Sequence, residues 1–68
     1  MDTLGDALPK EMARIRDEVM PVYQSIGNAG QPALMMMRAS LDEAAKAMAE
    51  GDIVAMVRSY EDMKGYEL

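Results

Sequence analysis

Paired carboxylates are the side chains of this sequence best suited to acid–base chemistry. The pairs are Asp17-Glu18, Asp42-Glu43 and Glu61-Asp62. Each pair lies on the polar face of a predicted helix and beside a Lys or Arg, where a carboxylate stays ionised and hydrated. None has the Asp-x-Asp-x-Asp-Gly spacing of a calcium-binding loop. We therefore interpret all three pairs as solvated surface.

Histidine and cysteine are both absent. Nucleophilic catalysis normally needs Ser, Cys or Thr beside a base, and the usual base is His. The ordinary zinc sites and any disulfide are excluded for the same reason. We predict a protein that is not an enzyme, with no catalytic residue and no cofactor.

Methionine is unusually frequent, with nine residues in a chain of 68, and three of them are consecutive at Met35, Met36 and Met37. Thioethers bind Cu(I). Consecutive residues of a helix point about 100° apart, however, so three adjacent side chains cannot converge on one ion. Methionine also packs adaptably and is common where a surface accepts a partner. We predict packing or an interface here, and no metal.

Charge and hydropathy limit the partners. The net charge of −5 disfavours nucleic acid and anionic lipid, which bind mainly through Lys and Arg. The loop 27–32 is rich in glycine but lacks the Gly-Lys-Ser/Thr of a phosphate-binding loop. No apolar run approaches the roughly 18 residues of a membrane span, and no secretory signal pattern is present at the start. We expect a cytoplasmic protein with no nucleic acid or membrane partner.

The apolar residues repeat with the period of a helix, so we predict an all-α fold: a small three-helix domain, a long kinked helix followed by a helical hairpin. Residues 1–68 form one domain, with 1–6 as a flexible lead-in and 65–68 as a short tail. The first helix is expected over 7–26, capped by Asp6 and with Pro9 in its first turn. Its apolar stripe is Leu8, Met12, Ile15, Val19, Val22 and Ile26. Its polar face includes Arg14, expected to pair with Asp17 or Glu18.

Pro21 interrupts this pattern, because proline removes a helical hydrogen bond and crowds the carbonyl of Asp17. The helix either kinks and continues to Ile26, which we favour, or ends near Met20. Gly27 and Gly30, which can both take positive φ, then separate it from the second helix, over 32–50.

The second helix passes through Ser40, although Ser40 to Glu43 resembles a capping box that could begin a helix there. Gly51 and Asp52 form a short joint to the third helix, over 53–64, which Gly65 ends. Tyr66 is placed on the surface of the tail.

The third helix is shorter than the second, which predicts an uncovered patch on the second helix at Leu34, Met35, Met36 and Met37. Such a patch favours a homodimer or another protein partner, so we predict a non-catalytic interaction protein or adaptor. The alternative is an acidic inhibitor that occupies a basic site on an enzyme or a nucleic-acid-binding protein.

Overall fold

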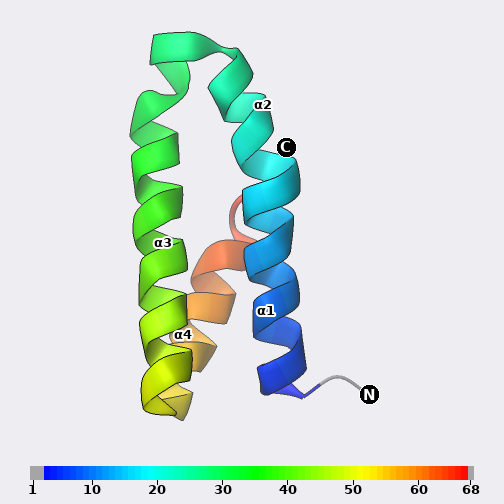
Figure 1. Ribbon diagram of the computed structural model, residues 1–68, viewed down its shortest axis with the longest axis vertical. Coiled ribbons are helices and arrows are strands. Elements are labelled where there is room, and N and C mark those ends of the chain that lie inside the picture. Colours follow the sequence, from blue (N-terminus) through cyan, green and yellow to red (C-terminus); the bar gives the residue numbers. More distant parts are fainter. Residues whose placement is uncertain (1–2, 68) are drawn as a thin grey trace.

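The computed structural model describes residues 3–67, which fold into helices joined by short turns, with no strand in that range. Figure 1 shows α1 (Leu4–Arg14), α2 (Met20–Ser25), α3 (Gln31–Glu50) and α4 (Ile53–Lys64). The π-helical segment η1 (Ile15–Val19) joins α1 to α2 without a break, and the 3₁₀ segment η2 (Gly27–Gly30) leads into α3. Counting α1, η1 and α2 as one rod confirms the predicted three-helix, all-α architecture. Met1, Asp2 and Leu68, which were assigned to the lead-in and the tail, lie outside the described residues.

The first rod begins earlier than expected. The helix starts at Leu4, and Thr3 is its N-cap. The Asp6 carboxylate accepts a 3.3 Å hydrogen bond from the Thr3 backbone N–H and a 3.0 Å bond from the Thr3 hydroxyl. The prediction that Asp6 is the cap was wrong, because Asp6 instead reaches back to the cap as the third residue of the helix. Pro9 accordingly lies in the second helical turn.

Pro21 is accommodated without ending the rod. Just before it, the backbone N–H of Met20 bonds to the carbonyl of Ile15, five residues back, so one turn is wider than an α-helical turn. The wider turn relieves the crowding that a proline ring imposes on the carbonyl four residues before it. Helix continuation past Pro21 is thereby confirmed as far as Ser25.

The wide turn changes which side chains face inward. Val22 and Ile26, which the regular period places in the core, are 46% and 54% exposed. Met20 is buried, and Tyr23 packs against the core in their place. The predicted stripe is therefore correct up to Val19 and wrong beyond it, because a π turn contains about one residue more than an α turn.

The two remaining joints follow the local sequence signals. Gly27 has a φ of +70° and follows the end of α2, whereas Gly51 has a φ of +65° and caps α3. The Asp52 carboxylate accepts a 3.1 Å hydrogen bond from the Ala55 N–H at the start of α4. Ser40 lies inside α3, as predicted. Gly30 does not take positive φ but is buried, and a Cβ there would lie 2.1 Å from the Tyr23 carbonyl oxygen.

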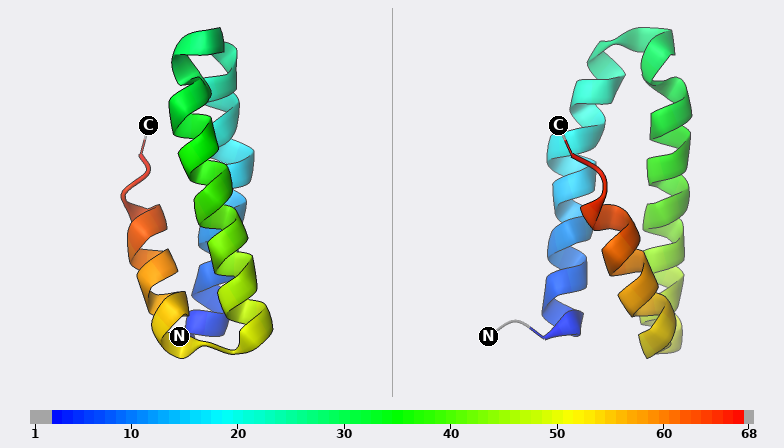
Figure 2. Two further views of the ribbon diagram at one scale, coloured as in Figure 1. Left: turned by 90° about the vertical axis from the view of Figure 1, so that its left-hand side faces the viewer. Right: turned by 180° about the vertical axis from the view of Figure 1, so that it is seen from behind.

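The molecule has two unequal halves. In the lower half of Figure 1, α4 packs against both α1 and α3, whereas above the end of α4 the helices α2 and α3 lie side by side with only the short C-terminal tail beside them (Figures 1 and 2). The whole measures 35 × 22 × 16 Å. We call residues 19–37, which form this two-helix upper half, the arm. The buried apolar residues are Leu8, Ile15, Val19, Met20, Leu34, Met37, Ala44, Ala47, Met56 and Met63.

Candidate interaction surface

The predicted interface residues divide between the core and the surface. Leu34 and Met37 are 0% and 1% exposed, so their assignment to an open patch was wrong. They are part of the core, on the side of α3 that α2 covers. Met35 and Met36 are 66% and 61% exposed, as the prediction requires. The sequence argument compared the lengths of the second and third helices and overlooked the cover that the first rod provides.

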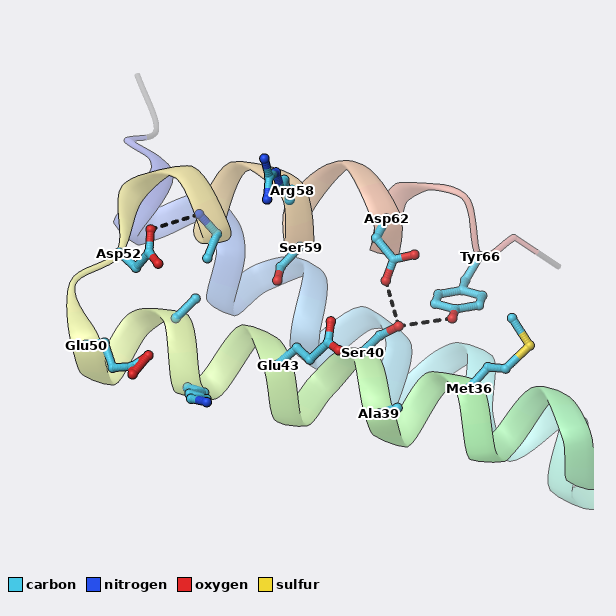
Figure 3. A pocket seen from close by; sticks show the side chains of 13 residues that line it. Met36, Ala39, Ser40, Glu43, Glu50, Asp52, Arg58, Ser59, Asp62 and Tyr66 are labelled. Atoms are coloured by element: carbon cyan, nitrogen blue, oxygen red, sulfur yellow. Dashed lines mark hydrogen bonds between the residues drawn. The ribbon is translucent and has the colours of Figure 1, made fainter.

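The two exposed methionines point to different sides of α3. Met36 lines the groove between α3 and α4, and Figure 3 shows it beside Tyr66 at the end of that groove. Met35 does not line the groove. As the residue before Met36, it projects from the helix about 100° away from Met36. Met36 therefore lies on the side of α3 that faces α4, just above the end of α4, and Met35 lies on another side.

The groove itself, of about 640 Å³, holds a hydrogen-bonded cluster (Figure 3). The buried Ser40 hydroxyl lies 2.6 Å from an Asp62 carboxylate oxygen, to which it donates, and 3.0 Å from the Tyr66 hydroxyl. An acyl-transfer site would also need free backbone N–H groups for an oxyanion, and Ser40 sits inside α3, where these groups bond within the helix. We interpret this cluster as a set of hydrogen bonds that attaches the C-terminal tail to α3. Tyr66 is half-buried there, so its predicted surface position was wrong.

The carboxylate pairs do not gather into a site. Among residues 3–67, no cluster of three or more acidic side chains is arranged to hold a metal ion. Asp17 is paired with its neighbour Arg16 at 2.9 Å, and that hydrogen bond lowers the pKa of the Asp17 carboxyl below its ordinary 3.8. The Asp62 carboxylate accepts the hydrogen bond from the Ser40 hydroxyl.

Arg14 has a role that the sequence did not indicate. Its Nη2 donates a 3.0 Å hydrogen bond to the Met63 carbonyl in the last turn of α4, and its guanidinium pairs with Glu11 at 3.1 Å. The predicted pairing with Asp17 or Glu18 was wrong. The same carbonyl also accepts the Tyr66 backbone N–H at 3.1 Å, and a cation at this end of a helix is favoured by the helix dipole. Arg14 thus marks the side of the first rod that faces α4.

Helix geometry places Val22 and Ile26 on this same side, above α4. Two α-helical turns take about 7.2 residues, and the π segment adds about one. Val22, eight residues after Arg14, therefore lies almost directly above it, and Ile26 follows one turn higher. On α3, Met36 is the exposed methionine on the side that faces α4. We call Val22, Ile26 and Met36 the arm face; all three are large, apolar and exposed.

The arm also lacks charge. No Asp, Glu, Lys or Arg occurs from residue 19 to residue 37, so all 12 acidic and all 7 basic residues lie outside it. Depletion of charged residues and enrichment in Met are typical of the centre of a protein interface. Outside the arm, the exposed large apolar residues of the described chain are on α4, in a short uncharged run bounded by Asp52 and Arg58: Ile53, Val54 and Val57.

Comparison with known proteins found no relative: no family model matches the chain, and neither the curated proteins nor the solved structures yielded a match. Within residues 3–67, none of the helices combines the length and the apolar character that crossing a membrane would require.

Proposed function

We propose that this chain is a non-catalytic, cytoplasmic interaction protein that acts as a homodimer and that its two copies meet through their arm faces. The observation that carries the proposal is the apolar surface above the end of α4, where no further helix of the described chain covers α2 and α3. There Val22, Ile26 and Met36 are exposed on an uncharged two-helix arm. The proposal keeps Met36 from the predicted patch, leaves out Leu34, Met35 and Met37, and adds Val22 and Ile26.

A second copy suits this position geometrically. In the lower half of the molecule, α4 covers the groove between the other helices, whereas above it the described chain adds only the short tail after α4, with Tyr66 beside Met36. Two arms packed across a two-fold axis would supply that cover to each other and form a four-helix arrangement. In a two-fold interface each patch meets its own copy, so a surface without charge avoids placing like charges together.

Electrostatics favours the same contact. Each copy carries a net charge of −5, and every charged residue lies outside the arm. Joining the copies through their arms allows the acidic helices to extend away from the contact, where water and salt screen their repulsion. Contact through α4 would instead bring acidic residues such as Asp52 and Glu61 close together.

Stability gives a further reason for association. A single hydrophobic core in a chain of this size rarely contributes more than about 3 to 5 kcal/mol to the free energy of unfolding, and oligomerisation is a common source of additional stability. The arm contributes to the core through one side only, with Leu34 and Met37 fully buried while the arm face stays open.

Sedimentation equilibrium at low salt and at about 0.5 M NaCl tests the proposal, because apolar association persists where exposed charges are screened. We expect a reversible monomer–dimer equilibrium at both salt concentrations, with affinity unchanged or higher at high salt. A chain that remains monomeric up to millimolar concentration would contradict the proposal. A monomer that binds a basic protein only at low salt would support an acidic inhibitor instead.

A further inference from the structure

We propose that Met36 is an oxidation-sensitive position and that its conversion to the sulfoxide by a peroxide separates the two copies. This inference rests on the proposed function and adds a means of regulating it. In the reaction, one oxygen of hydrogen peroxide is transferred to the thioether sulfur. The O–O bond breaks, an S–O bond forms, the sulfur loses two electrons and the peroxide leaves as water.

Exposure singles out the reactive sulfurs. Among the methionines of residues 3–67, only Met35 and Met36 are largely exposed, at 66% and 61%. Met37 and Met63 are 1% and 0% exposed, and Met20 and Met56 are both 7% exposed. A peroxide arriving from water therefore meets the sulfurs of Met35 and Met36 first.

Position separates the consequences of the two reactions. A sulfoxide is polar and needs a hydrogen-bond donor when it is buried. In the proposed contact, Met36 would lie against the arm face of the second copy, where the aliphatic Val22 and Ile26 offer none. The nearby Tyr66 hydroxyl is already bonded to Ser40. Oxidised Met36 therefore favours water over the dimer contact. Met35 points to another side of α3, where a sulfoxide stays hydrated in both states.

The dimer also protects Met36 from the reagent. In the arm-to-arm contact Met36 is covered while Met35 remains open, so oxidation of Met36 proceeds through the monomer. We expect the rate of Met36 oxidation, relative to that of Met35, to fall as protein concentration rises. Once formed, the sulfoxide prevents reassociation, so oxidation accumulates monomer.

The experiment compares the unmodified sequence with Met36→Leu and Met35→Leu, each before and after hydrogen peroxide treatment. Leucine is apolar, similar in volume and not oxidised, so both variants are expected to dimerise before treatment. Peptide mass mapping locates the added oxygens, and sedimentation gives the dissociation constant. After treatment we expect at least about a tenfold loss of affinity in the unmodified sequence and in Met35→Leu. Met36→Leu should remain dimeric, and methionine sulfoxide reductase should restore the oxidised dimers.

The two proposals can fail separately. If the untreated protein is monomeric, the proposed function fails. If the untreated protein dimerises and stays dimeric with Met36 shown by mass mapping to be oxidised, only the oxidation inference is overturned. Oxidation of Met36 at a rate independent of protein concentration in a confirmed dimer would also contradict it, since Met36 would then lie outside the contact.

Discussion

Replacing Met36 by glutamate should dissociate the proposed dimer while leaving the monomer folded. Full burial of a methionine side chain is worth about 1.5 to 3 kcal/mol. Because Met36 is 61% exposed in the single chain, covering the exposed part stabilises the dimer by about 1 to 2 kcal/mol per copy. Both copies contribute, so losing this term weakens association by about 2 to 4 kcal/mol, or roughly 30-fold to 1,000-fold in Kd. Two facing carboxylates would weaken it further.

Met35→Glu is the matched control, because it changes the net charge equally at a neighbouring residue that is 66% exposed. Sedimentation equilibrium should give a Kd within a few-fold of the unmodified value for Met35→Glu and a monomer for Met36→Glu. Circular dichroism should show unchanged helicity in both, because substitutions at exposed sites usually alter stability by less than about 0.5 kcal/mol. Equal effects of the two substitutions, or a dimeric Met36→Glu, would refute the arm-face geometry.

Three further predictions concern the fold, and the first two are best measured by urea unfolding in the monomeric Met36→Glu background. Met20→Ala should cost about 2 to 4 kcal/mol and Val22→Ala less than about 0.5 kcal/mol; the reverse order would show a regular α-helix in place of the π turn. Gly30→Ala should lower the free energy of unfolding by about 3 kcal/mol, because the facing backbone carbonyl cannot move aside. Gly27→Ala should lower it by about 1 kcal/mol, because the site has open space but a positive φ. Equal costs would argue against the close approach at Gly30. In the otherwise unmodified chain, Asp17→Asn should lower thermal stability at neutral pH. Because folding lowers the pKa of Asp17, this difference should vanish as the pH falls below 3.8, and a difference that grows there would contradict the ion pair.

Local chemistry was enough to predict most helix ends. Gly27 and Gly51 need no partner elsewhere in the molecule to adopt positive φ, and Asp52 caps the helix that immediately follows it. The continuous period through Ser40 correctly outweighed a competing capping signal. At the start of the chain only Asp6 was considered as a cap, and periodicity did not show that its carboxylate reaches back to Thr3, the residue that caps the helix.

The candidate surface depended on information that periodicity does not contain. The predicted stripe assumed a constant 100° per residue, an assumption that fails where Pro21 favours a wider turn, so Val22 was assigned to the core. Leu34 and Met37 were assigned to the surface from a comparison of helix lengths. Helix lengths show how far along α3 another helix reaches, but not which side of α3 it covers. The uncharged stretch around them was visible in the sequence and could have located the arm.

The extra residue in the π segment also bears on how this chain should be aligned with others. A protein that presents the same apolar face on a regular helix, without a proline at the position of Pro21, needs one residue fewer between its equivalents of Ile15 and Met20. An ungapped alignment would then match Val22 to an inward-facing position and misplace every later residue of that helix. Searches for distant relatives should therefore permit a single-residue gap between positions 15 and 20.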